Sequence, residues 1–429
     1  MILQPLLEFR VTIMRDDPPK YALRKALMVA WTSTNLDSVV EVNIGKSTDI
    51  FKDYLGPYKV PYLLTPALYT LINAIPSMRQ LRTIQLNNII LSKMYLRAIL
   101  SAPHPIHLIL DTVQLPKISS FRPATLRKLT LTMMSSWENV QPFVAQLATS
   151  LEYLELKSCK FPHRLQLQLP SFPCLQEMRY HQHYTRSNVP GVSELSQVLR
   201  LAPQVTRLYV TGRFHKEPLT ACRESLQYLF ISSCMLSEYM FGSKPFPRLK
   251  HLSLTDYEFF CRANRPRPRP PLPSSFILDH FPMITSLTIS MLWKYRNHAM
   301  ETAQSQHRLK ALKLDIIIRD EIEDHEIDPY FPVEAPNDQP HRTMLPAALQ
   351  TLKLEVTQYD VHDKLERSAA RCSRWVCDDV IPSVTGLGGP ALKSIDLLVS
   401  LRKGRPTARE QVLSRQWVKV PNGDWHRAE

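Results

Sequence analysis

One hexapeptide, apolar-x-x-apolar-x-apolar, recurs along the chain and constrains its fold more than any other feature. A single copy would occur by chance in an amphipathic helix, but eleven clear copies indicate an internal repeat. The clear copies begin at Leu81, Leu126, Leu151, Leu175, Val205, Leu226, Leu249, Ile284, Leu309, Leu349 and Leu392. Weaker copies begin at Leu6, Val39 and Ile106. Several of the intervals are 20–29 residues long, and the longer ones imply insertions between repeats.

The chemistry of the repeat predicts the fold. Its last two apolar positions alternate with a polar one, so they lie on one face of a short strand. A single strand cannot bury that face, whereas parallel neighbours about 4.8 Å apart form a continuous core. Segments 142–150 and 192–200 have helical spacing. The sequence therefore predicts an α/β solenoid, a curved horseshoe with a parallel β-sheet on its concave face and irregular helices and loops outside.

Composition agrees with this interpretation and excludes other folds. The chain of 429 residues has 59 leucines and 35 prolines but only 10 glycines. Proline precedes many copies of the repeat, where it fits a turn that leads into the strand; these are Pro76, Pro123, Pro173, Pro203, Pro247, Pro282 and Pro346. Scarce glycine disfavours folds whose backbone must approach a phosphate closely.

Gly45-Lys46-Ser47 follows an apolar strand and imitates a phosphate-binding loop. That loop needs a glycine five residues before Gly45, and the position is Val40, inside the strand. We therefore interpret Lys46 as a lysine in a turn.

The sequence also predicts where the protein resides. Seven cysteines scattered over more than 200 residues are typical of reduced thiols rather than of a disulfide framework. No apolar stretch approaches the roughly 18 residues that span a bilayer, and the first ten residues lack the pattern of a secretory signal. We expect a cytoplasmic or nuclear protein with no membrane association.

Two copies of the repeat are followed by a cysteine three residues after their last apolar position; these are Cys159 and Cys234. Leucine-rich repeats place asparagine or cysteine there. Over residues 36–400 the sequence resembles leucine-rich-repeat proteins of the irregular, cysteine-containing kind. Its recurring Pro-x-Leu-x-x-Leu-x-Leu pattern resembles that of fungal F-box and F-box-like repeat proteins. In that family an N-terminal F-box helix docks on a ubiquitin-ligase scaffold and the repeats hold the substrate. Here the first residues instead resemble a repeat strand, and no F-box is recognisable.

This resemblance implies one irregular repeat array over residues 1–400, with a degenerate capping segment at its N-terminal end. Residues 401–429 form a basic tail. Within it an Asn-Gly turn lies between two short apolar segments from Trp417 to Trp425, which predicts a β-hairpin that caps the array.

Signatures of catalysis, metal binding and cofactor binding are weak. Neither a G-x-S-x-G elbow nor an H-E-x-x-H helix occurs. Cys372 and Cys377, with His362 upstream, lack the second ligand pair of a zinc site. His181 and His183 alternate on a degenerate strand without a third ligand in the sequence nearby. We expect no catalytic residue, metal or cofactor.

Charge raises the question of nucleic acid. The net charge is +14, with a basic, proline-rich segment at 262–273 and an acidic one at 315–328. The first could be a peptide ligand, a nuclear signal or a phosphate-binding arm, or simply a surface insertion. Basic residues are otherwise spread along the repeats rather than clustered on one element, so we regard nucleic acid as an unlikely partner.

The polar positions on either side of the inner leucine should project from the concave face of the sheet. In the middle repeats they include aromatic and arginine side chains, which are typical of protein-binding hot spots. We predict a partner-binding surface formed by Tyr153, Arg179, Arg207, Tyr209, Tyr228, Phe230 and His251. The alternative is a solvated face with binding elsewhere.

Together these features predict a non-enzymatic protein-recognition module. The resemblance implies a substrate-binding, F-box-like component linked to a ubiquitin ligase. The alternative is a repeat scaffold unconnected to ubiquitin, including one that binds nucleic acid or a regulatory GTPase.

Overall fold

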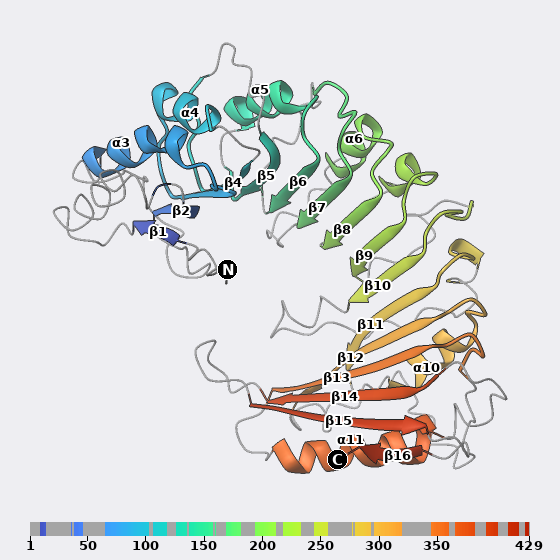
Figure 1. Ribbon diagram of the computed structural model, residues 1–429. Coiled ribbons are helices and arrows are strands. Elements are labelled where there is room, and N and C mark those ends of the chain that lie inside the picture. Colours follow the sequence, from blue (N-terminus) through green and yellow to red (C-terminus); the bar gives the residue numbers. More distant parts are fainter. Residues whose placement is uncertain are drawn as a thin grey trace, which may run out of the picture. The chain divides into compact units, whose positions relative to one another are not determined.

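A computed structural model of the chain places its main elements in two compact units, Met1–Ser225 (unit 1) and Leu226–Glu429 (unit 2) (Figure 1). The structure describes residues 9–13, 36, 38–45, 65–102, 106–117, 126–134, 137–157, 159, 169–181, 194–211, 218–232, 244–255, 277, 279–292, 296–319, 345–359, 365–381, 392–401, 411–419 and 425–428.

Unit 1 contains a sheet in which every described strand pairs in parallel with the next strand along the chain. The strands are β1 (Phe9–Ile13), β2 (Val39–Gly45), β3 (Thr83–Asn87), β4 (Ile106–Asp111), β5 (Leu126–Thr132), β6 (Tyr153–Lys157), β7 (Glu177–His181) and β8 (Arg207–Thr211). The helices are α3 (Thr65–Ala74), η2 (Ile75–Ser77), α4 (Lys93–Leu100), α5 (Trp137–Leu147), α6 (Glu194–Leu201) and η3 (Pro218–Cys222).

Unit 2 begins in the same way and ends differently. Its strands are β9 (Tyr228–Ser232), β10 (His251–Thr255), β11 (Ser286–Leu292), β12 (Ala311–Arg319), β13 (Thr351–Tyr359), β14 (Ser394–Leu401), β15 (Gln411–Lys419) and β16 (Trp425–Ala428). Its helices are α10 (Arg296–Gln304), α11 (Leu365–Trp375) and the π-helical turn η7 (Val376–Val380). Strands β9 to β14 are parallel, and β15 and β16 are antiparallel to their neighbours. Strands β15 and β16 lie where the sequence predicts a hairpin, and β15 pairs with β14 at the edge of the parallel strands of unit 2.

The register of the strands in each unit follows the sequence repeat. In unit 1 the fourth position of the repeat pairs with the fourth position of its neighbour, as Leu129 does with Leu154. In unit 2 the same holds for Leu312 and Leu352. Each of the eleven clear copies and three weak copies contributes one of the strands β1 to β14. This confirms the predicted α/β class with a mostly parallel sheet, an arrangement compatible with a solenoid.

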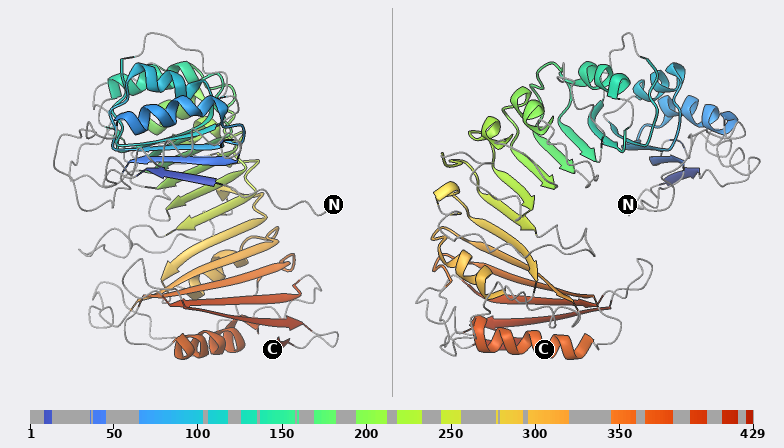
Figure 2. Two further views of the ribbon diagram at one scale, coloured as in Figure 1. Left: turned by 60° about the vertical axis from the view of Figure 1, so that its left-hand side comes forward. Right: turned by 180° about the vertical axis from the view of Figure 1, so that it is seen from behind.

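The helices of unit 1 lie along one face of its sheet (Figures 1 and 2). The apolar repeat positions point to that side and are almost fully buried, with Leu129, Leu131 and Leu208 at 0% exposure. The predicted helices at 142–150 and 192–200 correspond to α5 and α6; α6 nearly coincides with its predicted segment, whereas α5 begins earlier, at Trp137, and ends at Leu147. Side chains at the alternate positions lie on the face away from the helices, which we call the helix-distal face.

Proline marks a recurrent turn before the strands. The amide of Leu175 donates to the carbonyl of Phe172, three residues back, and Leu249 and Ile284 repeat this bond with Phe246 and Phe281. In each case proline follows the phenylalanine, at the turn position where its fixed φ is favourable. The three phenylalanine side chains are fully buried. The predicted role of these prolines in the turns is thus confirmed.

A second recurrent turn follows β3, β4 and β5. Asn88, Thr112 and Met133 have φ of 55°, 55° and 51°, and each comes directly after its strand. Their amides donate to a carbonyl of the next strand, for Met133 that of Lys157 at 2.8 Å. Left-handed conformations normally favour glycine. Here the bonds to the next repeat hold three non-glycine residues in them, in keeping with a glycine-poor chain.

Several predicted features lie outside the described residues. They are the segment 262–273, residues 320–328 of the acidic segment, Lys46, His183, Cys234 and His362. The predicted boundary between residues 400 and 401 falls at the last residue of β14 and stays a prediction. Among the helices the structure describes, none is both long enough and apolar enough to span a bilayer.

Candidate functional site

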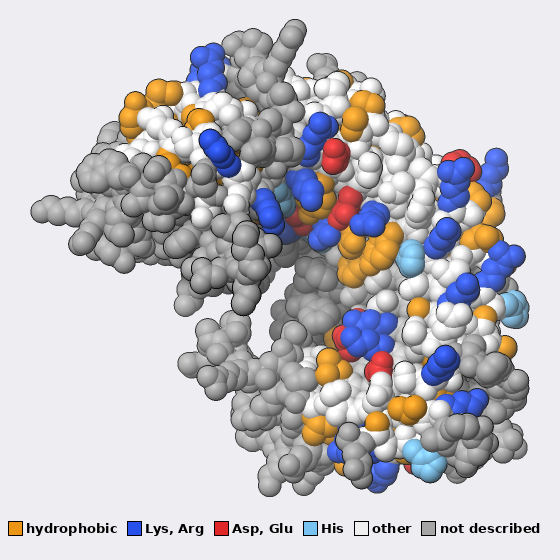
Figure 3. Space-filling view, in the orientation of Figure 1, with side chains coloured by type: hydrophobic (Ala, Val, Ile, Leu, Met, Phe, Trp, Pro, Cys, Tyr) orange, Lys and Arg blue, Asp and Glu red, His pale blue; other side chains and the backbone are white. Residues whose placement is uncertain are grey.

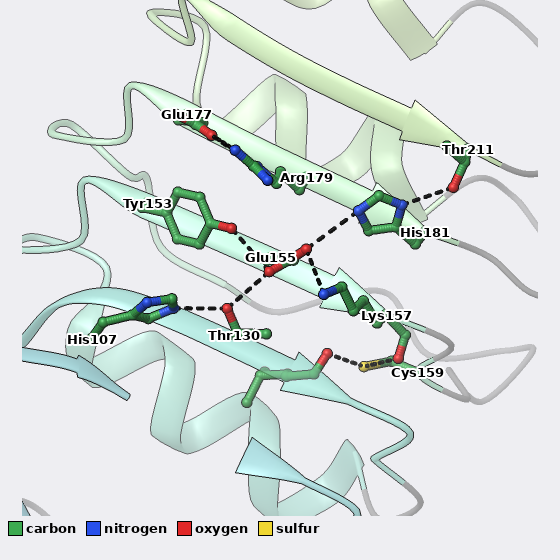
Figure 4. A network of polar contacts seen from close by, with 11 residues as sticks. His107, Thr130, Tyr153, Glu155, Lys157, Cys159, Glu177, Arg179, His181 and Thr211 are labelled. Atoms are coloured by element: carbon green, nitrogen blue, oxygen red, sulfur yellow. Dashed lines mark hydrogen bonds and ion pairs between the residues drawn. The ribbon is translucent and has the colours of Figure 1, made fainter. Parts of the chain in front are cut away.

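The helix-distal face of β5 to β8 carries a network of polar side chains centred on Glu155 (Figure 4). This carboxylate is only 5% exposed. Its Oε2 accepts hydrogen bonds from the hydroxyls of Tyr153 at 2.9 Å and Thr130 at 3.0 Å. Its Oε1 lies 3.0 Å from Nζ of Lys157 and 3.3 Å from Nε2 of His181. Four partners from three strands therefore surround one buried charge.

These contacts set the protonation state of Glu155. Burial by itself would raise the pKa of this carboxyl, since it disfavours the charged form. Hydrogen bonds from His181, Lys157 and Tyr153, together with the charge of Lys157, outweigh burial and hold the pKa of Glu155 far below its ordinary 4.5. Burial and the neighbouring Glu155 charge raise the pKa of Tyr153, which stays a hydrogen-bond donor. Glu155 is thus a charged acceptor at neutral pH.

Two histidines extend the network in opposite directions. Thr130 gives its single hydroxyl proton to Glu155, so it can only accept from Nε2 of His107, at 2.9 Å. His107 therefore carries a proton on Nε2. His181 contacts Glu155 through Nε2 and the hydroxyl of Thr211 through Nδ1 at 2.8 Å. One connected set of contacts runs from β4 to β8.

The order Thr211–His181–Glu155 is that of a hydroxyl nucleophile, a base and an orienting carboxylate. The environment of Thr211 argues against a role as a nucleophile. Thr211 is 4% exposed and ends a strand, so a substrate has little access to its hydroxyl. We interpret this set of contacts as a device that orders the side chains of the face.

Burial lowers the pKa of His107 below its ordinary 6.5, and Lys128, Lys157 and Arg179 add to the effect while Glu155 opposes it. A group with a lowered pKa in the folded state stabilises the fold above 6.5 and loses that contribution as the pH falls. We therefore expect the free energy of unfolding to decrease below pH 6.5, and to decrease less in His107→Gln, whose amide can still donate to Thr130. Denaturation in urea at pH 7.5, 6.5 and 5.5 would measure this. Parallel pH profiles for the two proteins would contradict it.

The face brings three of the predicted site residues of unit 1 into contact. The guanidinium carbon of Arg179 lies 4.2 Å from the ring centre of Tyr209 and 5.5 Å from that of Tyr153. Nε and Nη2 of Arg179 bond Oε1 of Glu177 at 2.9 and 2.8 Å. The fourth, Arg207, reaches the other oxygen of Glu177 at 3.9 Å. Glu177 thus joins the two arginines.

The other predicted residues lie in unit 2. Tyr228 and His251 are register neighbours on β9 and β10, with ring centres 6.0 Å apart. Phe230 faces Ser253 in the register, on the same side of β9 as Tyr228. The seven predicted residues are therefore divided between the units, four in unit 1 and three in unit 2.

Unit 2 has a second charged group, on β12 and β13. Lys313 pairs with Lys353 in the register, and Asp315 pairs with Glu355. Nζ of Lys313 lies 3.2 Å from Asp315 and 2.7 Å from Glu355, and Lys353 lies 2.7 Å from Glu355. Burial raises the pKa of Asp315, whereas the hydrogen bonds of the two lysines lower that of Glu355 despite its burial. Asp315, the first residue of the predicted acidic segment, is therefore part of a strand.

Cys159 behaves as a structural residue. Its thiol donates to the carbonyl of Leu131 in the neighbouring repeat at 3.4 Å, and burial raises the pKa of the thiol to about 12. The equivalent positions of the three preceding repeats are apolar and buried: Ile89, Val113 and Met134. Cys372 is buried and Cys377 exposed. Within the described ranges, no three His, Cys, Asp or Glu side chains gather as metal ligands would.

The sequence prediction did not include the centre of this network among the site residues. It selected the tyrosines and arginines but omitted Glu155, Lys157, His181 and Thr211, and it did not consider His107 in this context. Extending the repeat alignment by one residue past its last apolar position would have aligned Lys157, His181 and Thr211 in one row, as the register does.

No protein-family model matches the chain, and no curated protein matches it.

Proposed function

We propose that the chain is a non-enzymatic leucine-rich-repeat protein that recognises another protein through the helix-distal faces of its sheets. The observation that carries this proposal is the placement of Arg179 against Tyr153 and Tyr209 on a partly exposed sheet face. Arginine and tyrosine dominate hot spots because they combine large contact area with directional bonds. Tyr228, Phe230 and His251 provide a similar group in unit 2.

The leucine-rich-repeat assignment is supported by the strand register, which follows the repeat, and by the bond of Cys159 to the neighbouring repeat. A role as the substrate-binding, F-box-like component of a ubiquitin ligase is supported only by the resemblance of the repeats. We propose this role as a separate claim.

Affinity purification of the tagged full chain tests both claims. Arg179→Ala/Tyr209→Ala removes the group in unit 1, and Tyr228→Ala/Phe230→Ala removes that in unit 2. Loss of one hot spot costs about 2 kcal/mol or more, so recovery of a directly bound partner should fall about thirtyfold. Tyr69→Ala/Met94→Ala is the matched control, because these side chains are 47% and 54% exposed on the helices of unit 1.

The outcomes separate the claims. Loss of partners from the face variants but not from the control supports recognition by these faces. Equal recovery of every partner with all variants would show that these faces do not bind. If no ligase scaffold accompanies any form of the protein, the ubiquitin claim is wrong and the recognition claim stands.

A further inference from the structure

On the helix-distal face of β5 to β8, the cationic side chains are more exposed to solvent than the carboxylates. Four are cationic and two are carboxylates, a balance of +2: Lys128, Lys157, Arg179 and Arg207 against Glu155 and Glu177. The side chains of Lys157, Arg179 and Arg207 are 42%, 37% and 64% exposed, and Lys128 is also exposed. Those of Glu155 and Glu177 are 7% and 18% exposed. The surface offered to solvent is therefore mainly cationic (Figure 3).

The neighbours of Arg179 hold its guanidinium in one orientation. Two tyrosine rings contact its guanidinium, and Glu177 takes the edge formed by Nε and Nη2. The other edge, formed by Nη1 and Nη2, retains donors for a second carboxylate. Because the planar group is already fixed, binding loses little side-chain entropy.

From this arrangement we infer that the helix-distal face of β5 to β8 binds an acidic peptide segment of the partner, with Arg179 as its central contact. The inference rests on the proposed recognition function and adds the chemistry of the ligand. Charge complementarity selects that ligand, since exposed cations surround carboxylates that are already buried and paired.

The spacing of the cations favours a peptide over a nucleic acid. Lys128 and Arg207 share one row and are three strands apart, or about 14 Å at the usual strand spacing. An extended peptide covers this distance in about four residues, with alternate side chains on one side. Glu177 lies between Tyr153 and Arg207 in that row, and a peptide can place an uncharged residue opposite it, whereas a phosphate backbone carries a charge on every nucleotide.

Fluorescence anisotropy with labelled peptides tests the inference on the full chain. The probe is (Ser-Glu)5, which presents glutamates on one side when extended, and (Ser-Gln)5 is its uncharged match. We expect (Ser-Glu)5 to bind, and its affinity to fall about tenfold in Arg179→Ala. Arg179→Lys keeps the charge but loses the planar guanidinium, which donates paired hydrogen bonds and stacks on the tyrosine rings. Its affinity for (Ser-Glu)5 should therefore fall several-fold. Lys128→Gln removes an exposed charge with little effect on folding and should also weaken binding.

Arg200→Ala is the control, because it removes one exposed positive charge from helix α6. It should leave the affinity for (Ser-Glu)5 unchanged. Equal affinity for the two peptides, or unchanged affinity in both Arg179→Lys and Lys128→Gln, would overturn the inference. A ten-nucleotide oligo-dT that binds more tightly than (Ser-Glu)5, with the same dependence on Arg179, would overturn it in favour of a phosphate ligand.

Failure of the acidic-peptide inference and failure of the proposed function give different results. If (Ser-Glu)5 fails to bind while the face variants still lose their protein partners, only the acidic-peptide inference fails. If the face variants keep every partner, the proposed recognition surface fails whatever the peptides do.

Discussion

Replacing Glu155 with alanine is expected to lower the free energy of unfolding of unit 1 by about 2–3 kcal/mol, the cost of leaving its buried and half-buried hydrogen-bond donors without an acceptor. The change leaves Tyr153, Thr130, Lys157 and His181 around an empty position. Buried donors without an acceptor retain their desolvation cost, so the loss exceeds that of any single hydrogen bond. Glu155→Gln keeps the shape and one acceptor oxygen and should cost less.

Hydrogen exchange would localise the effect. Amides of β5 to β8 should exchange faster in Glu155→Ala, while those of β11 to β13 in unit 2 serve as an internal reference.

The lowered pKa of Glu155 predicts that the stability of the protein depends on pH. A carboxyl with a lowered pKa stabilises the fold above its ordinary 4.5 and loses that contribution below it. The stability difference between wild type and Glu155→Gln should therefore shrink as the pH falls below 4.5. A constant difference would contradict the network.

Phe246→Ala should destabilise unit 2 by about 3–5 kcal/mol, as is usual when a fully buried phenylalanine is removed. Its side chain has 0% exposure, and its ring centre lies 5.7 Å from that of Phe281. Its amide donates to the carbonyl of His280 at 2.8 Å, and its own carbonyl receives the amide of Leu249. The cavity would thus open beneath a turn that leads into β10.

Arg248→Ala is the matched control for Phe246→Ala, because Arg248 belongs to the same turn but is exposed. It should change the stability by no more than about 0.5 kcal/mol. Urea denaturation followed by circular dichroism measures both variants. If Phe246→Ala costs no more than Arg248→Ala, the buried phenylalanine does not support the turn.

The strands were predictable because a local pattern also determined their pairing. Leucine in the repeat must face the core, and a shift of one residue would expose it, so the frame of the hexapeptide fixed the register. Even the weak copies at Leu6, Val39 and Ile106 lie in or lead into strands β1, β2 and β4. The positions of helices α5 and α6 followed from periodicity in the same way.

The network around Glu155 was less predictable. Its members extend from His107 to Thr211, and their contacts depend on side-chain directions across five strands. The repeat predicts which residues share a row, but not that Glu155 is buried while Arg179 stays partly exposed. The left-handed turns at Thr112 and Met133 were also missed, because neither residue type signals that conformation.

The reversed direction of β15 has a consequence for how such a chain can grow. Repeat arrays lengthen when a unit is duplicated and the copy pairs in parallel with its neighbour. The edge of β14 that such a copy would need is occupied by β15, in antiparallel pairing from Ser394 to Leu401. Gene duplication can therefore add repeats before β14, whereas a repeat inserted after it would have to displace β15 and β16.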